Sequence, residues 1–402
     1  MIRIDTYKEA EDALRINDLR QCNYDAGALM MSDVVVNLHG DEHRARRNLE
    51  SKIFRRDFFH HYEREVFPAT LLKTMTPFLG KGSLDTVDFG HRVLLNLTAD
   101  FSGIDRPEDT AVETEHLLRL LKSFALASVL GTMTYGKDEA VAEITKAMTE
   151  FDRTFLAFSV ARRRAALERF ARGEITEDDL PRDILTILLR NEDRIELSPE
   201  ALLREMAFFL MAGAQTSVHS LAHCMHHIFT WMQNHPEDRE KMLTDNFFLQ
   251  RCVFEGMRLH PSSPVAQRRP TCPVHLPTGQ DAGPEETVVI DLLTANRDTA
   301  KFGADAAVFN PYRTAPDAQF PYGLSFGYGM HACLGRNLAA GIPSKPDSDA
   351  KEHHYGTVTL IARALLDAGA RPDPANPPEM DKRSGRPNWG VYPVLLNKPA
   401  SY

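Results

Sequence analysis

The stretch Phe326-Gly327-Tyr328-Gly329-Met330-His331-Ala332-Cys333-Leu334-Gly335 carries one cysteine in a glycine-rich loop, just before a helix-like run that begins at Leu334. Glycine lets a backbone fold closely around a sulfur atom, because it tolerates left-handed dihedral angles. The N–H groups at the start of a helix can donate hydrogen bonds to a thiolate and lower its pKa. The pattern therefore predicts that Cys333 is an anionic metal ligand; a buried, inert cysteine in a turn is the alternative.

The pattern F-G-x-G-x-H-x-C-x-G in this loop resembles the heme-binding loop of the cytochrome P-450 family. In such proteins the cysteine thiolate is the axial ligand of the iron and donates electron density that favours O–O cleavage. The resemblance implies heme b (iron protoporphyrin IX) as the cofactor and Cys333 as the ligand of its iron. The other loop positions that it assigns to the cofactor are Phe326, Gly327, His331 and Gly335.

Helical patterns dominate the rest of the chain. The resemblance implies a mainly α, single-domain fold with a minor β part over residues 1–402, in which the heme lies between a long central helix and the cysteine loop. Short strands are predicted near the N-terminus, at 287–290 and at 390–396. Helices are predicted at 7–15, 41–58, 60–78, 84–99, 112–130, 137–170, 181–190, 199–234, 236–243, 246–259 and 357–368.

The long central helix is predicted from about Pro199, with Ser198 as its N-cap, and it ends before His235-Pro236. Its middle, Met206 to Ala214, is apolar on all sides and is therefore expected to be buried. Small and hydroxyl-bearing residues at 212–217 would allow a flat ligand to approach the helix.

The resemblance places Ala212 and Gly213 of this helix against the cofactor and Gln215 and Thr216 at the catalytic position. The family usually carries an acid before the threonine, and this chain has Gln215 instead. An amide can hold a water molecule but has no titratable proton, whereas Thr216 keeps the hydroxyl. We expect proton delivery through ordered water, through His219 one turn further along, or through a group of the substrate.

Three charged residues match a buried network that supports the heme side in the family. Glu255 and Arg258 stand three residues apart on a predicted helix and can therefore pair on one face. Arg313 follows before the cysteine loop and completes the match. An exposed surface pair is the alternative, since this spacing is common on helices.

The two propionates of a heme require cationic or hydrogen-bonding partners. His43 and Arg47 lie four residues apart on one helical face, which suits a carboxylate, and they match propionate-binding positions of the family. Arg269, or its neighbour Arg268, and His331 match two further positions.

A solvated basic face is the alternative interpretation of residues 43–56, and both can hold. The remaining cations of this segment would then lie outside and could dock an acidic electron donor. They are Arg44, Arg46, Lys52, Arg55 and Arg56.

Two segments depart from the family pattern. The chain before His43 is shorter than the family usually shows, so we expect a more open substrate entrance. Residues 341–356 interrupt the helix expected after Cys333, because Pro343 and Pro346 cannot stand in a helix interior. We interpret this segment as an inserted loop near the thiolate face.

The composition is that of an ordinary globular protein, with 43% hydrophobic and 26% charged residues among 402. The net charge of −9 argues against nucleic-acid binding and against adhesion to an anionic membrane. Five cysteines without a pattern indicate no disulfide framework. The sequence shows neither a secretory signal nor an apolar run that could span a bilayer. We therefore expect a cytoplasmic protein without a membrane anchor.

The function implied by the resemblance is a heme-thiolate monooxygenase that inserts one oxygen atom from O2 into an apolar small molecule, by hydroxylation or epoxidation. Ferredoxin and ferredoxin reductase, or an equivalent donor, would supply the electrons. A peroxide-dependent or non-hydroxylating heme-thiolate enzyme, suggested by Gln215, and a noncatalytic heme binder are alternatives. Family topology gives as pocket residues Tyr24, Met30, Met31, Phe155, Phe158, Phe209, Leu210, Ala212 and 263–266.

A remote alternative of another class is a serine hydrolase. Gly323-Leu324-Ser325-Phe326-Gly327 satisfies the G-x-S-x-G pattern of a nucleophile elbow. That elbow requires a buried strand before the serine and a helix directly after it. The sequence around Ser325 predicts neither.

Overall fold

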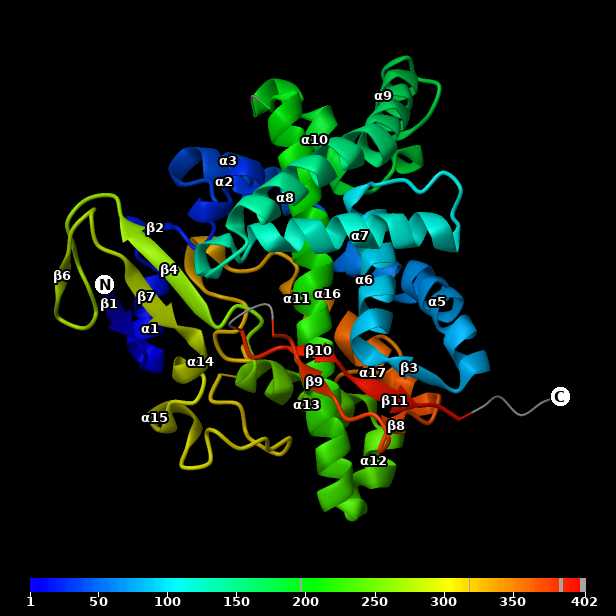
Figure 1. The fold of residues 1–402 in the computed structure, drawn as a ribbon, viewed down its shortest axis with the longest axis vertical. Helices are drawn as coiled ribbons and strands as arrows, with labels where there is room; N and C mark the ends of the chain where they lie inside the picture. Colours follow the sequence, from blue (N-terminus) through cyan, green and yellow to red (C-terminus); the bar gives the residue numbers. More distant parts are fainter. Residues whose placement is uncertain (196, 318, 383–385, 398–402) are drawn as a thin grey trace. The chain divides into compact units, whose positions relative to one another are not determined.

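The computed structural model describes residues 1–195, 197–317, 319–382 and 386–397, and within them the chain is mainly helical with four small sheets (Figure 1). The predicted fold class is thus confirmed. The chain divides into two compact units. Unit one consists of Met1–Arg20, Phe59–Gly90 and the described part of Thr216–Tyr402, and unit two of Gln21–Phe58 and His91–Gln215. The single domain expected over residues 1–402 stays a prediction.

Helix α11 (Pro199–Asn234) is the long helix predicted from the sequence, and Figure 1 shows it as one unbroken helix. Its 36 residues span about 54 Å. The Ser198 hydroxyl accepts the N–H of Ala201 at 3.1 Å, so the predicted N-cap is confirmed. The expected burial is wrong at two positions in the apolar middle, because Ala212 is half-buried and Gly213 is exposed.

The largest sheet of unit one has the strand order β1-β7-β4-β2. Strand β7 (Val288–Asp291) is central, with β1 (Ile2–Ile4) parallel and β4 (Val265–Pro270) antiparallel to it, and β2 (Leu19–Gln21) at the edge. Helix α1 (Tyr7–Leu14) shares a core with this sheet, in which Ala10, Ile290 and Leu324 are among the buried residues.

A second sheet joins β3 (Ser83–Asp85), β11 (Pro393–Leu395) and β8 (Arg371–Pro372) in antiparallel pairs. The remaining strands form two short antiparallel pairs, β5 (Val274–His275) with β6 (Asp281–Ala282), and β9 (Glu379–Met380) with β10 (Trp389–Val391).

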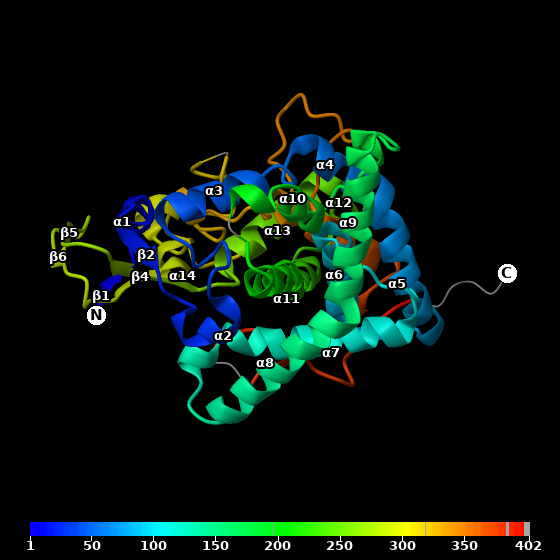
Figure 2. The same ribbon diagram turned by 90° about the horizontal axis from the view of Figure 1, so that it is seen from above.

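Unit two consists mainly of helices. Helices α7 (Ala111–Ala127) and α8 (Lys137–Phe151) lie side by side in both views (Figures 1 and 2). A π-turn at Asp152–Leu156 connects α8 directly to α9 (Ala157–Ala171), which confirms the long helix predicted over 137–170. The other α-helices that lie mainly in this unit are α2 (Ala28–Met31), α3 (Gly40–Glu50), α6 (Thr86–Ser102) and α10 (Ile184–Arg190).

Several predicted boundaries are wrong, including the start predicted at residue 181, because α10 begins at Ile184. The helix predicted over 41–58 breaks at Ser51, and α4 (Arg56–His61) is separate. The helix predicted from residue 84 begins at Thr86, and the strand over 390–396 divides at Tyr392. The last two differences share a cause, because one Asp85 carboxylate oxygen accepts the N–H groups of both Val87 and Tyr392. Asp85 therefore ends β3 and starts α6.

The other helices of unit one include α12 (Arg239–Thr244) and α13 (Asn246–Leu259), which follow α11. Further α-helices are α5 (Phe67–Lys81), α14 (Leu292–Ala295), α15 (Thr299–Phe302), α16 (Arg336–Ala340) and α17 (Thr357–Asp367).

The predicted insertion after α16 is a loop closed at its base. The Gln250 amide donates to the carbonyls of Ala340, His354 and Tyr355 at 3.1, 3.3 and 3.0 Å. The Glu63 carboxylate accepts the N–H groups of Tyr355 and Gly356 and pairs with His354. The helix therefore stops at Gly341, as predicted, and the two ends of the loop are held together by side chains of α13 and of the π-turn at Tyr62–Val66.

Candidate functional site

The loop that carries Cys333 folds back on itself, and the Cys333 thiol is exposed. The Cys333 N–H donates to the Phe326 carbonyl at 2.8 Å and so closes the loop. Gly327 and Gly329 have φ values of +65° and +67°, which residues with a Cβ rarely adopt. The two glycines thus allow the turn that the sequence predicted, and the exposed sulfur can accept a metal.

A donor of this kind fits the predicted cofactor. A thiolate binds iron, and the loop leaves the sulfur exposed beside Phe326, which is itself half-buried. Helix α16 begins only at Arg336, two residues later than the predicted start at Leu334. Within the described residues, no group of three or more His, Cys, Asp or Glu side chains could hold a metal ion.

The structure brings Glu255, Arg258 and Arg313 together. The fully buried Arg258 guanidinium donates to both oxygens of the Glu255 carboxylate at 2.7 Å. Arg313 donates to the same carboxylate at 3.1 Å, and the N–H of Asn310 adds a bond at 3.2 Å. Every oxygen of the buried acid therefore has a partner, which a buried charge requires.

Asn296 connects this network to the cysteine loop, a role that the sequence did not predict. Its side-chain amide donates to the Arg258 carbonyl at 3.0 Å and to the Ser325 hydroxyl at 2.9 Å, and its oxygen accepts the Leu324 N–H at 2.8 Å. Asn296 is fully buried. The end of α13 and the start of the cysteine loop are thus held by one side chain, which only the tertiary contacts could identify.

Ser325 has a structural role in the same junction. Its hydroxyl donates to the Met257 carbonyl at 2.8 Å and accepts from Asn296. It lies in a turn, with neither a strand before it nor a helix directly after it. The arrangement is not a nucleophile elbow, and the serine hydrolase alternative loses its basis.

The catalytic candidates on α11 differ in exposure. Thr216 is exposed and Gln215 is half-buried. The Thr216 carbonyl accepts the Ser262 hydroxyl at 2.8 Å, and Ser262 lies 3.0 Å from the hydroxyl of Ser220. Ser262, which follows α13, therefore links Thr216 to Ser220 one turn further along α11.

Gly213 is required by helix packing within unit two. A Cβ at this position would lie 2.8 Å from the Cγ2 atom of Thr98 on α6. The glycine thus lets α6 approach α11. Its contact with a cofactor stays a prediction, as does that of Ala212.

His219, the alternative proton carrier, lies beside a histidine cluster. Its Nδ1 atom is 2.9 Å from the Asn388 amide nitrogen. Further along, the His227 and His260 Nε2 atoms are 2.9 Å apart, and His223 stacks on His260. Burial and the neighbouring histidines lower the pKa of His223 to about 4, of His227 to about 3 and of His260 to about 2. These three imidazoles are therefore neutral at pH 7.

Strand β4 separates the two arginine candidates for a propionate. Arg268 is buried and Arg269 is exposed, because successive side chains of a strand point to opposite faces. His331 is half-buried at the end of a 3₁₀ turn.

The two candidates in unit two lie on α3. His43 is buried, and burial together with the Arg47 and His39 charges lowers its pKa to about 4. His43 is thus neutral at pH 7 and would act as a hydrogen-bonding group, while Arg47 carries the charge.

The expectation that Arg46 lies outside with the other basic residues is wrong. Arg46 is buried, because its guanidinium pairs with the buried Glu205 carboxylate at 2.5 Å. Arg44 is exposed as expected. The Arg56 side chain lies outside the described residues.

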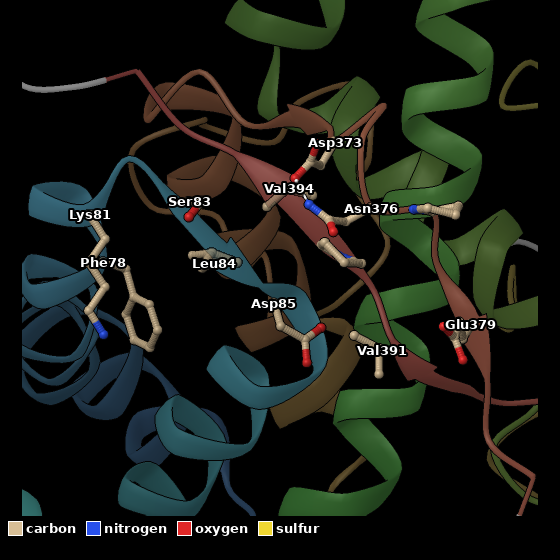
Figure 3. Close-up of a pocket in the computed structure, with 12 residues that line it drawn as sticks. Phe78, Lys81, Ser83, Leu84, Asp85, Asp373, Asn376, Glu379, Val391 and Val394 are labelled. Atoms are coloured by element: carbon tan, nitrogen blue, oxygen red, sulfur yellow. Dashed lines mark hydrogen bonds between the residues drawn. The ribbon is translucent and has the colours of Figure 1, made fainter.

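A pocket of about 490 Å³ lies elsewhere in unit one, against β3 and β11 (Figure 3). Lys81, Asp85, Asp373 and Glu379 contribute charged groups, but none of the predicted site residues lines it. Asp85 and Asp373 accept backbone N–H groups of their own turns. The pocket is therefore not the predicted site. Across the described residues, we find no helix with the length and apolarity needed to cross a membrane.

Replacing Asn296 by alanine should destabilise the protein. Each buried group left without a partner costs about 1–3 kcal/mol, so we expect the free energy of unfolding to fall by roughly 2–4 kcal/mol. Urea denaturation measures this change. The control is Asn376→Ala, since Asn376 is exposed and its side-chain amide pairs with Asp373; equal losses in the two variants would contradict the role of Asn296.

The family model described as "Cytochrome P450" (cytochrome P-450) matches residues 112–341, more than half of the chain. Pulcherriminic acid synthase of Bacillus subtilis (strain 168) is 23% identical over 321 residues, which span 78% of this chain and 72% of that protein. In seven further curated relatives the matched stretch spans between 17% and 55% of their length.

Solved structures match over nearly the whole chain. The crystal structure of CalO2 gives a TM-score of 0.74 at 18% identity, covering 98% of this chain and 90% of that one. CYP154A1 from Streptomyces coelicolor A3(2) gives 0.73 at 21% identity, covering 98% and 91%. With the cysteine loop and its buried anchor, these matches lead to one conclusion: the chain belongs to the cytochrome P-450 family of heme-thiolate monooxygenases.

Proposed function

We propose that this protein inserts one oxygen atom from O2 into an apolar small molecule, by hydroxylation or epoxidation, with heme b as its cofactor and Cys333 as the iron ligand. The observation that carries the proposal is the exposed Cys333 thiol in a loop anchored to a buried ion-pair network. When bound, the heme supplies the redox chemistry by which O2, two electrons and two protons yield oxygenated substrate and water.

The residues proposed to hold the cofactor are those that the family resemblance assigns to it. Cys333 binds the iron, while Phe326, Gly327 and Gly335 border it in the loop. We favour Arg268 over Arg269 as the partner of a heme propionate, because Arg268 lies on the buried face of β4, where it could contact a ligand inside the protein. The other groups proposed to contact the cofactor are His43, Arg47, His331, Ala212 and Gly213.

The Thr216 hydroxyl would hold a water molecule or a proton beside the place where oxygen reacts. Its exposure in the middle of α11 leaves it accessible to such a water. Gln215 can orient the water through its amide but has no proton to release at neutral pH. The protons would thus arrive through water rather than from an acid on α11.

Electrons would come from ferredoxin and ferredoxin reductase, or an equivalent donor, in the cytoplasm. Because Gln215 replaces the usual acid, a peroxide-dependent reaction is the second candidate. Product formation with hydrogen peroxide, and none with ferredoxin, its reductase and O2, would favour that candidate.

Cys333→Ser should abolish the red-shifted Soret band of the reduced, carbon-monoxide-treated protein, since that band reports a thiolate ligand. Cys272→Ser removes the other exposed cysteine and should leave the band unchanged. A band that survives in Cys333→Ser would refute the ligand assignment.

Thr216→Ala should separate electron consumption from product formation, because the hydroxyl that holds the proton or water is lost. We expect the share of electrons recovered in product to fall several-fold, with hydrogen peroxide released instead. Thr216→Ser keeps the hydroxyl and should retain most of the coupling. Unchanged coupling in the alanine variant would exclude the hydroxyl from proton delivery.

Arg268→Ala should speed the loss of heme about tenfold, since a hydrogen bond from a charged group contributes about 1.5–3 kcal/mol. The transfer of heme to apomyoglobin measures this rate. Arg269→Ala is the matched control on the exposed face of the same strand. A faster loss in Arg269→Ala than in Arg268→Ala would reverse the assignment.

A further inference from the structure

The buried face of α3 in unit two carries ionisable side chains where a packed helix usually carries apolar ones. His43, Arg46 and Glu50 lie along one face, at intervals of three and four residues, and all three are buried. Charged side chains are almost never fully buried unless they are paired. Glu50 is fully buried, so its charge must be compensated or absent.

The Arg46 guanidinium, which lies on the same buried face of α3, is paired with another carboxylate. Arg46 donates to Glu205 of α11 at 2.5 Å, and both Glu205 oxygens accept the N–H of Val35, at 3.1 and 3.2 Å. Glu205 thus has the partners that an ionised carboxylate requires.

Glu205 and its neighbour hold the chain before α3 to α11. Arg204 donates to the Ser32 carbonyl at 2.9 Å and to the Asp33 carboxylate at 2.7 Å, while Glu205 binds Val35. Two consecutive residues of α11 therefore secure the segment 32–35. This segment follows Met30 and Met31, which were predicted to line the substrate pocket.

Glu50 has no such partners. Neither of its carboxyl oxygens has a hydrogen bond within the described part of the chain. The charged groups that act on it are Glu205 of α11 and, from α3 itself, Arg46 and Arg47. Helix α10, which packs on α3, is not the source of any of these charged groups. Arg46 is already bound to Glu205 and Arg47 is only half-buried, so a second ionised carboxylate here would be a buried charge without a hydrogen-bonded partner among the described residues.

We propose that Glu50 is a neutral carboxylic acid beside the ionised Arg46–Glu205 pair, and that ionisation of Glu50 weakens the hold of α11 on the segment 32–35. Ionised Glu50 would repel Glu205 and compete for Arg46, so Glu205 would bind Val35 less firmly. Burial and repulsion from Glu205 raise the pKa of Glu50 well above its usual value, in line with this geometry. Burial also raises the pKa of Glu205, but Arg46 and the Val35 N–H favour its charged form, so Glu50 is the carboxyl group of the two that keeps the proton.

The sign of the pH dependence follows from the direction of the Glu50 shift. The folded protein keeps a proton that the unfolded chain releases near pH 4.3, the ordinary value for Glu. Stability from this group is therefore full below about pH 4.3 and is lost as the pH rises through the raised pKa. Across that window one extra bound proton lowers the ratio of folded to unfolded protein roughly tenfold per pH unit.

The test compares the full-length protein, purified with its cofactor, with Glu50→Gln, which keeps the shape and cannot ionise. Urea denaturation between pH 5 and 7 should show the folded-to-unfolded ratio of the natural protein falling about tenfold per pH unit relative to the variant. Glu168→Gln on the exposed face of α9 is the control and should keep the profile of the natural protein. A Glu50→Gln profile parallel to the natural one would overturn the proposal.

Hydrogen exchange at the Val35 amide tests the second part of the proposal, namely that ionised Glu50 weakens the hold of α11 on the segment 32–35. Its protection factor should fall with pH in the natural protein, stay constant in Glu50→Gln and be low at every pH in Glu205→Gln. Constant protection in the natural protein would overturn the link to the segment 32–35.

Should Glu50→Gln fail to fold, Glu50→Leu replaces it. The infrared band of a protonated carboxyl group in the natural protein at pH 6.5 then provides a second readout. Absence of that band would equally refute the neutral acid.

Discussion

The buried guanidinium of Arg258 is the constraint on which unit one depends. A charge without access to water must be met on all its donor groups, and the structure meets it with the Glu255 carboxylate and with the carbonyls of Asn296 and Ala306. The ring of Phe302 lies 4.7 Å below the same group. One side chain therefore fixes the end of α13 relative to α15 and to the irregular chain that follows α14 and α15.

The position of the cysteine loop depends on the same buried Arg258 guanidinium. Asn296 is held through its carbonyl by Arg258, and its side chain in turn holds Leu324 and Ser325. From Phe326 onward the loop is closed by its own backbone bond to Cys333. A metal ligand must be placed to within a fraction of an ångström, and such placement requires a rigid support behind the ligating residue. A chain of buried hydrogen bonds provides it.

In unit two, buried charged groups face the same requirement for partners, but not all of them meet it. Arg46 and Glu205 satisfy each other, and Val35 completes the carboxylate. Glu50 shares their buried space without a hydrogen bond of its own within the described residues. A carboxyl group buried in this way makes the stability of the protein depend on pH, because burial tolerates its neutral form and destabilises its charged form. Glu255 and Glu50 are both buried glutamates, and they differ in whether hydrogen-bond partners among the described residues satisfy their carboxyl oxygens.

The sequence by itself determined the features that depend on local pattern. These features are the glycine spacing around Cys333, the apolar run of α11 and the Ser198 cap of that helix. Each one involves residues that are close together in the sequence, so periodicity and turn chemistry suffice to predict it. Tertiary structure alone decided which of Arg268 and Arg269 is buried, where α3 ends, and that Arg46 faces inward. It also decided the roles of Asn296 and Glu50. The hydrogen-bond partners Leu324 and Arg258 lie 28 and 38 residues from Asn296, and Glu205, which repels Glu50, lies on another helix. Burial and hydrogen-bond satisfaction are properties of such distant contacts, and no local pattern encodes them.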